Sequence, residues 1–294
     1  MVFIIATKDR PLELRRLLQS IEQQSVKPGQ IIVVDSGTVR ADTVIGEFPK
    51  LPVSYIFSQP PSASRQRNEG LAAVSSSAEY IGFIDDDAVF EENSFQEMNH
   101  FWSTARPLVG GASFNMANHP PLFAASLKTH SFVERLGLYS SKRGAVLPSG
   151  FQTMIGTVDK DTRVDWLPSG AVLWQKRILD RYRFDEWYKG YSYLEDLDFS
   201  YTVGRSHQLF VVAGARYYHF PPSQGRGSDY EFGKKEVKHR LYFVRKNPGL
   251  SKGKCTQALI LRMLISLLLI VRTGSPTYLK RALGNFVGLI QSVK

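Results

Sequence analysis

Three consecutive aspartates, Asp85, Asp86 and Asp87, directly follow the apolar run Tyr80–Ile84. A run of this kind is typical of a buried strand, which would hold the carboxylates at one edge of a sheet. Adjacent carboxylates repel one another unless a cation or solvent compensates their charge. Mg²⁺ and Mn²⁺ take carboxylate and phosphate oxygens as ligands. The pattern therefore predicts a metal site for a substrate such as a nucleotide diphosphate, with a solvated acidic turn as the structural alternative.

A second acidic cluster, Glu195, Asp196 and Asp198, lies at the start of a predicted helix. The helix dipole favours negative charge at that position, which is one explanation of the cluster. The other explanation is catalytic. Neighbouring carboxylates raise one another's pKa and so bring one of them toward the range of a general base. Asp196 is our candidate for that base, with Glu195 or Asp198 as the alternative.

The elements that position these residues alternate between strand and helix along the first hundred residues. The patterns predict strands at 2–6, 30–34, 53–57 and 80–84, with helices at 11–23 and 64–75. Asp9, just before Pro11, suits a helix N-cap. Such alternation favours an α/β fold with a mostly parallel sheet flanked by helices. Ligands bind beyond the carboxyl ends of such strands, and Thr7, Asp35 and Asp85 each follow a strand.

The rest of the chain is less regular. Residues 112–163 show no clear period and are interpreted as an insertion or loop; patterns return at 164–174, with a helix at 175–182 and a strand at 209–213. We predict a domain at 1–225, with halves at 1–110 and 111–225. A helical C-terminal region would follow at 226–294.

The positive charge of the chain lies in that C-terminal region. The net charge is +10, yet residues 226–294 hold 14 Lys and Arg against 3 Asp and Glu, so the remaining 225 residues are close to neutral. This distribution argues against nucleic-acid binding. The same region contains the apolar run Ala258–Val271, which is interrupted by Arg262 and shorter than the ~20 residues of a membrane span. It predicts attachment to an anionic membrane surface, with a buried helix as the alternative.

Two further features bear on the location of the protein. The single cysteine, Cys255, excludes an intramolecular disulfide and fits a reducing compartment. Met1 leads straight into an apolar strand pattern without a basic leader segment. We therefore expect the protein in the cytoplasm, on the inner face of the plasma membrane.

Taken together, the ordered motifs resemble the inverting family 2 glycosyltransferases, which have the GT-A fold and include enzymes of bacterial polysaccharide and O-antigen synthesis. The stretches that carry the resemblance are Ile4–Arg10, Ile32–Gly37, Ser64–Gly70, Ile84–Asp87, Trp166–Ala171 and Glu195–Asp196, spread over roughly residues 1–220. The family often has two acidic residues after its second strand, and this chain has Ser36 at the second position.

The resemblance implies that residues 1–110 form a nucleotide-binding half, that residues 111–225 form an acceptor-binding half, and that each motif has a role. The nucleotide-binding residues would be Thr7, Asp35, Arg67, Asp85 and Asp86; the metal ligands would be Asp87, Asp85 and His219, holding Mn²⁺ or Mg²⁺; the catalytic carboxylates would be Asp196 and Glu195; and the acceptor site would include Trp166, Gly170 and Trp187. Turn chemistry, solvated helix faces and core packing are the structural alternatives for these positions.

The implied activity is metal-dependent transfer of one sugar from a nucleotide-diphosphate sugar to a glycan or polyprenyl-linked acceptor in cell-surface polysaccharide synthesis. One alternative is sugar-nucleotide synthesis by nucleotidyl transfer, although Ala6–Pro11 has none of the glycines that its loop would need. The other is a non-catalytic protein that binds nucleotide sugars or membranes.

Overall fold

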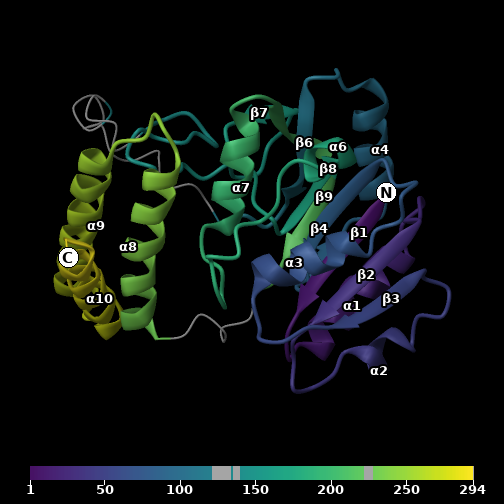
Figure 1. The fold of residues 1–294 in the computed structure, drawn as a ribbon, viewed down its shortest axis with the longest axis horizontal. Coiled ribbons are helices and arrows are strands. Elements are labelled where there is room, and N and C mark those ends of the chain that lie inside the picture. The colour runs from purple at the N-terminus through teal and green to yellow at the C-terminus, as the bar shows by residue number, and fades with distance from the viewer. Residues whose placement is uncertain (121–133, 135–139, 222–227, 294) are drawn as a thin grey trace. The chain divides into compact units, whose positions relative to one another are not determined.

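The structure is a computed structural model of the chain, and it describes residues 1–120, 134, 140–221 and 228–293. It contains two compact units (Figure 1). The first comprises Met1–Pro121 and Ile155–Pro222, and the second comprises Leu122–Met154 and Ser223–Lys294. The predicted domain limits at 110 and 225 stay predictions.

The first unit is a nine-stranded sheet with helices on both faces. Its strands are β1 (Val2–Thr7), β2 (Gln30–Asp35), β3 (Val53–Phe57), β4 (Tyr80–Asp85), β5 (Ala88–Phe90), β6 (Val109–Met116), β7 (Thr162–Val164), β8 (Ala171–Gln175) and β9 (Gln208–His219). Its helices are α1 (Pro11–Glu22), α2 (Asp42–Ile45), α3 (Ala63–Ala72), α4 (Ser94–Thr104), α6 (Lys176–Leu179) and α7 (Glu195–Gly204).

The order of the strands is β3-β2-β1-β4-β8-β6-β9-β5, and β7 pairs with β9. The four strands from β3 to β4 are parallel to one another, whereas β8 is antiparallel to both β4 and β6. The predicted α/β class is confirmed, and the parallel order is concentrated in the N-terminal half of the sheet. In this register Thr7 pairs with Asp35, and Ala6 pairs with Asp85. The polar residues that follow β1, β2 and β4 therefore lie along the same edge.

The two faces of the sheet are covered by different helices, because successive residues of a strand point to opposite sides. Phe3 of β1 packs on Phe95 of α4, with ring centroids 4.9 Å apart, in a core that also includes α1. Ile4 points to the other face, toward α3. A Cβ on Gly70 of α3 would collide with the Ile4 side chain, so glycine is needed for this close approach.

The turn between β1 and α1 differs from the expected helix cap. The predicted N-cap at Asp9 is wrong: the cap position is Arg10, without a side-chain cap hydrogen bond. Asp9 instead has a positive φ of 53°, and its carboxylate accepts hydrogen bonds from the backbone N–H groups of Thr38 and Val39, at 2.6 and 2.8 Å. Asp9 thus joins the loop after β1 to the loop after β2.

The second unit contains α8 (Asp229–Lys246), α9 (Lys252–Thr273) and α10 (Pro276–Val293), which lie side by side (Figure 1). Ser228 and Ser251 cap the N-termini of α8 and α9 through their side-chain oxygens. Close packing of α10 on α8 requires glycine at 284, where a Cβ would collide with the backbone carbonyl of Tyr230. The predicted helical C-terminal region is confirmed.

Several elements differ from the sequence expectations. The helix predicted at 175–182 is reduced to Lys176–Leu179, because β8 runs to Gln175. The sequence analysis missed β5, α4 and β6; glycines in β6 weaken its strand pattern, and Trp174 fills the space above Gly111. In the segment predicted to be irregular, residues 121–133 and 135–139 lie outside the described residues.

Candidate active site

The aspartates at the end of β4 point in different directions. Asp86 is buried, and its carboxylate accepts a hydrogen bond from Thr7 Oγ1 at 2.7 Å and one from Arg10 Nη1 at 3.0 Å. Burial raises the pKa of Asp86 to about 7, and the charge of Arg10 opposes that rise. This hydrogen bond therefore fixes the side chains of Thr7 and Asp86 relative to one another. That either residue contacts a nucleotide stays a prediction.

Asp85, Asp87 and His219 converge from three elements. Asp85 ends β4, Asp87 lies in the turn before β5, and His219 ends β9; the pairing of Ala88 with His219 brings β9 to that turn. One ligand atom from each of the three residues lies within 4.8 Å of the others, and His219 Nε2 is 2.9 Å from Asp87 Oδ1. Carboxylate oxygens suit Mn²⁺ or Mg²⁺, and a neutral imidazole can serve as a third ligand to a divalent ion. The residues present fit the predicted metal.

Tyr217 adds a polar group that the sequence analysis missed. Its side chain is fully buried, and its hydroxyl has no hydrogen-bond partner among the described residues. Burial raises the pKa of Tyr217 far above its usual value, and the charges of Asp85 and Asp87 raise it further. A Cβ on Gly170 would lie 3.1 Å from the Tyr217 hydroxyl and 3.7 Å from Asp85 Oδ2. A side chain at position 170 would therefore crowd the Tyr217 hydroxyl. The backbone carbonyl of Gly170 accepts a hydrogen bond from Asp85 N–H at 2.9 Å.

Arg67 of α3 joins the two acidic clusters. Its Nη1 donates to Glu195 Oε1 at 2.6 Å, and its Nη2 donates to Asp85 Oδ1 at 3.0 Å. The guanidinium carbon also lies 5.3 Å from the ring centroid of Phe184. Arg67 is only 5% exposed, so its charge is directed at these two carboxylates. A contact between Arg67 and the nucleotide stays a prediction.

Glu195 and Asp196 begin α7, directly after Leu194 with its positive φ of 75°. Burial raises the pKa of Glu195 to about 7; the charge of Asp196 adds to the rise and Arg67 opposes it. Burial also raises the pKa of Asp196, whereas the hydrogen bond that its carboxylate accepts from Leu197 N–H at 2.7 Å lowers it. Asp196 is the more exposed of the two carboxylates. Two adjacent carboxylates with raised pKa values are suited to general-base chemistry near neutral pH.

Asp35, at the end of β2, is fully buried and organises its own loop. Its Oδ1 accepts a hydrogen bond from Gly37 N–H at 2.7 Å. Its Oδ2 accepts from Ala41 N–H at 2.9 Å and from the Tyr55 hydroxyl at 3.0 Å. A contact of this carboxylate with a nucleoside base stays a prediction.

The two tryptophans predicted for the acceptor site lie in different environments. Trp166 is buried and belongs to the segment that links β7 to β8, whereas Trp187 is partly exposed in the loop before α7. The Trp187 ring lies edge-on to that of Tyr188, with centroids 5.4 Å apart. The structure thus groups Thr7, Arg67, Asp85–Asp87, Gly170, Glu195, Asp196 and His219 through direct contacts or charge interactions. The acceptor-binding roles of Gly170, Trp166 and Trp187 stay predictions.

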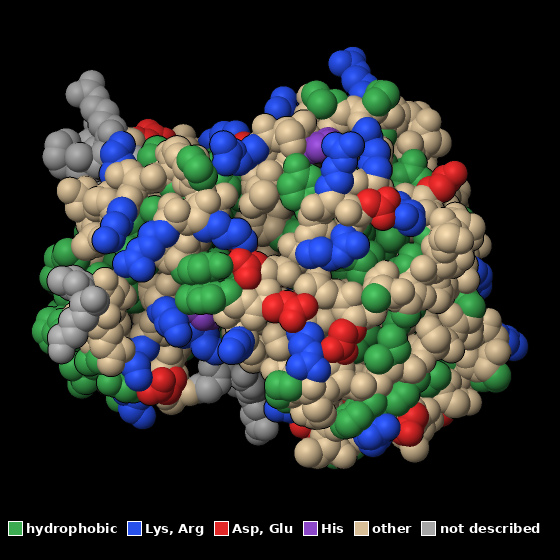
Figure 2. Space-filling model, in the orientation of Figure 1, with side chains coloured by type: hydrophobic (Ala, Val, Ile, Leu, Met, Phe, Trp, Pro, Cys, Tyr) green, Lys and Arg blue, Asp and Glu red, His purple; other side chains and the backbone are tan. Residues whose placement is uncertain are grey.

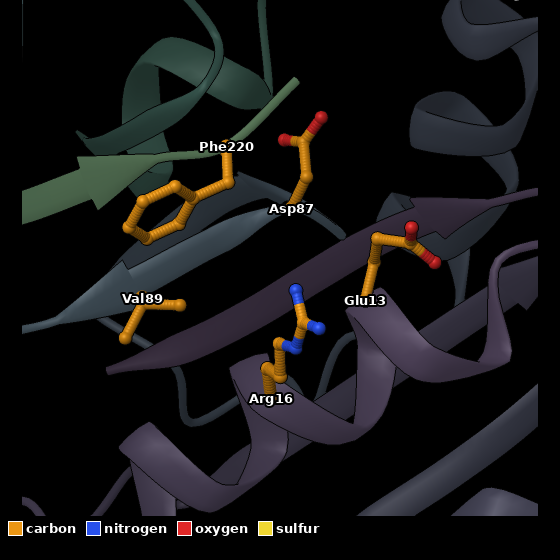
Figure 3. A pocket seen from close by; sticks show the side chains of 5 residues that line it. All are labelled: Glu13, Arg16, Asp87, Val89 and Phe220. Carbon is orange, nitrogen blue, oxygen red and sulfur yellow. The ribbon is translucent and has the colours of Figure 1, made fainter. Parts of the chain in front are cut away.

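A small depression adjoins Asp87 on the side of α1. Figure 3 shows Glu13 and Arg16 pointing from α1 toward the strands, with Val89 and Phe220 completing the lining. Arg16 and Arg10 are cations near the acidic cluster that the sequence analysis did not assign. For Arg10, the signal was its place in the polar segment that follows β1.

Comparisons with known proteins agree with this fold. Residues 2–143 match the model of glycosyl transferase family 2. No match to the sequence was found among curated proteins.

Three solved structures share the fold. The crystal structure of S. aureus TarS has a TM-score of 0.56 at 14% identity, covering 90% of this chain and 42% of TarS. TarS 1–349 in complex with UDP-GlcNAc has the same TM-score and identity, covering 87% and 69%. The mannosyltransferase PcManGT from Pyrobaculum calidifontis, in complex with GDP-Man and Mn²⁺, has a TM-score of 0.56 at 12% identity, covering 99% and 86%. The chain therefore spans less than half the length of full TarS.

Proposed function

The chain contains a family 2 glycosyltransferase domain of the GT-A type, and on this premise we propose that it transfers one sugar from a nucleotide-diphosphate sugar to a glycan or polyprenyl-linked acceptor. The reaction would depend on Mn²⁺ or Mg²⁺ and invert the configuration at the anomeric carbon. The family match favours this reaction over nucleotidyl transfer.

The donor would bind where β4, β5 and β9 meet. Asp85, Asp87 and His219 would hold the ion, as supported by the 4.8 Å spacing of their ligand atoms. A bound divalent ion supplies positive charge to the two phosphates and so stabilises the leaving nucleotide. Arg10 would keep the acidic turn in place, because it is paired with Asp86 and lies 3.5 Å from Asp87 Oδ2.

Asp196 is the proposed general base. Glu195 is already paired with Arg67 at 2.6 Å and is nearly enclosed, which leaves Asp196 as the more accessible carboxylate. Asp196 would accept the proton of the acceptor hydroxyl as that oxygen bonds to the anomeric carbon. The bond from that carbon to the diphosphate breaks on the opposite face, and its electron pair leaves with the nucleotide. The raised pKa of Asp196 suits this role.

The acceptor would lie near Gly170, which adjoins Asp85 and the Tyr217 hydroxyl. Trp166 and Trp187 would contribute aromatic surface, on which sugar rings pack. A role in cell-surface polysaccharide synthesis on the inner face of the plasma membrane completes the proposal.

The convergence of Asp85, Asp87 and His219 beside the Glu195–Asp196 pair is the observation that carries this proposal. A ligand that binds only the native state raises the unfolding temperature. We expect one of UDP, GDP, dTDP or CDP to raise the unfolding temperature only when Mn²⁺ is present.

The Asp87→Asn variant should lose that metal-dependent shift. The exposed Asp159 provides the matched control, because Asp159→Asn makes the same change outside the acidic cluster. No shift with any nucleotide, or an unchanged shift in Asp87→Asn, would contradict the proposed donor site.

A further inference from the structure

The helix α9 exposes an apolar face. Its exposed large side chains are Ile260, Leu261, Leu264, Ile265, Leu267, Leu268 and Val271. They recur at intervals of three, four and seven residues, so they share one side of the helix. Leu268 is 69% exposed and Val271 is 88% exposed. Contiguous apolar surface of this kind marks an interaction site.

The helix α10, which packs against α9, exposes an apolar stripe of its own. Leu279, Leu283, Phe286 and Ile290 are each close to half exposed and follow one another at helical intervals. We call these side chains of α9 and α10 together the apolar face. In Figure 2, hydrophobic side chains reach the surface at the left edge, where α9 and α10 lie.

Arg262 does not interrupt the apolar face, because it is directed into the helical unit. Its Nε lies 2.7 Å from Glu236 Oε1 of α8, and Arg281 of α10 lies 3.2 Å from the other oxygen of the same carboxylate. Glu236 is fully buried, which raises its pKa, but nearby positive charges, those of Arg262 and Arg281 first, and a hydrogen bond from Asn285 together hold the pKa below its usual value. This ion network ties the inner side of α9 to α8 and α10.

Basic residues lie at the ends of the apolar face. Lys254 and Arg272 fall on one line of α9 with Leu261 and Ile265, because steps of seven, four and seven residues return to the same side. Lysine and arginine in such positions extend their charged ends to lipid headgroups while their stems stay on apolar surface. Residues 226–294 hold 14 Lys and Arg against 3 Asp and Glu. A second copy of this strongly basic region would repel the first, whereas an anionic bilayer attracts it.

We propose that the apolar face of α9 and α10 docks in the plane of an anionic lipid bilayer. Among the described residues, α9 is the one helix that is long and apolar enough to cross a membrane, with 22 residues and a mean hydropathy of 1.8. Crossing would carry Glu236 and the charged side chains of α8, such as exposed Lys238 and Arg245, into hydrocarbon. In-plane docking leaves those charges on the side of the helices away from the lipid.

The first experiment measures binding of the full chain to phosphatidylcholine vesicles with and without 30% phosphatidylglycerol, in the absence of any nucleotide. Binding is expected only with the anionic lipid. The Leu268→Ser variant should bind about tenfold more weakly, because it loses a leucine side chain that the bilayer would bury. Lys254→Gln should bind about fivefold more weakly. Leu108→Ser makes the same change at a comparably exposed leucine of the sheet unit and should bind like the parent chain.

A second measurement separates docking from spanning. In a Cys255→Ala background, a single cysteine replaces Leu261, Leu264, Leu268 or Val271 and carries a fluorophore. Quenching by lipids that are brominated at two different depths measures how deeply each fluorophore lies in the bilayer. In-plane docking predicts equal depth at the four positions. Spanning predicts a difference of about 15 Å between the first and the last, at 1.5 Å per residue.

The outcomes are distinct. Equal depths together with the weaker binding of Leu268→Ser support the proposal, and a gradient of depth overturns it. Absence of vesicle binding overturns it too. A dimer in solution that Leu268→Ser dissociates would assign the apolar face to a second copy. Since no donor is present, none of these results depends on the proposed transfer reaction.

Discussion

Replacing Arg67 by methionine tests whether this residue organises the carboxylates or binds the nucleotide. In the structure its guanidinium is shared between Glu195, at 2.6 Å, and Asp85, at 3.0 Å. Methionine has a similar unbranched side chain but carries no charge. The variant Arg67→Met would therefore leave Glu195 buried without its cation.

The expected loss of stability depends on pH. Removing one partner of a buried ion pair costs about 3–5 kcal/mol when the other stays ionised. Glu195 has a pKa of about 7 in the fold, so below pH 7 it is protonated in both the parent and the variant. The variant then loses only one hydrogen bond from a charged donor, which costs about 2 kcal/mol of stability. Asp85 moderates the loss further, because its side chain is 34% exposed and stays hydrated.

The sign of the pH effect follows from proton linkage. Loss of Arg67 raises the pKa of Glu195 further above its unfolded value, because Arg67 opposes the effects of burial and Asp196. Above pH 7 the native variant then holds a proton that both the unfolded chain and the native parent have released. The difference in unfolding free energy should therefore grow with pH, by at most about 1.4 kcal/mol per unit. We expect about 2 kcal/mol at pH 6 and about 3–5 kcal/mol at pH 9.

Urea denaturation at pH 6 and pH 9 measures this difference for Arg67→Met, Glu195→Gln and the double variant. The double variant should be more stable than the sum of the single losses predicts, by about 2 kcal/mol at pH 9, since it leaves no buried charge unpaired. Arg163→Met, at an exposed arginine of β7, is the matched control. The reasoning fails if Arg67→Met unfolds like the parent at both pH values but binds the nucleotide more weakly. Arg67 would then be the nucleotide ligand that the sequence suggests.

Three further variants test the site. Asp196→Asn should lower nucleotide release from the donor by about 10²–10⁴-fold without changing donor binding, and a loss below tenfold would favour Glu195 as the base. In the parent chain the same rate should rise with pH toward neutrality, because burial raises the pKa of Asp196; a rate that is flat from pH 5 to 8 would exclude this base. His219→Ala should weaken Mn²⁺ binding in the presence of nucleotide by about tenfold or more in calorimetric titration, and unchanged affinity would remove His219 from the metal site. Tyr217→Phe should leave the unfolding free energy unchanged or raise it by up to about 1 kcal/mol in urea, because it removes a buried hydroxyl without a partner; a clear loss would reveal a hydrogen bond that the structure lacks.

The local patterns were sufficient for the N-terminal half of the sheet. Apolar runs bounded by polar residues located β1 to β4, and the parallel order then placed Thr7, Asp35 and Asp85 at one edge. The strand predictions were less accurate where the apolar pattern of the strand was weak. Glycines obscured β6, and the strand predicted at 209–213 extends to His219, which is what brings that residue to Asp87.

The sequence by itself determined which chemical groups are present and where along each element they fall. These include the carboxylates after β4, the acidic start of α7 and the basic, apolar C-terminal helices. Only the tertiary structure decided which groups face one another. Arg67 meets Glu195 across 128 positions of sequence, and Asp86 turns inward to Thr7 while Asp87 turns to His219. Such pairings depend on helix packing and strand order, which bring distant segments together and leave no periodic signal in the chain.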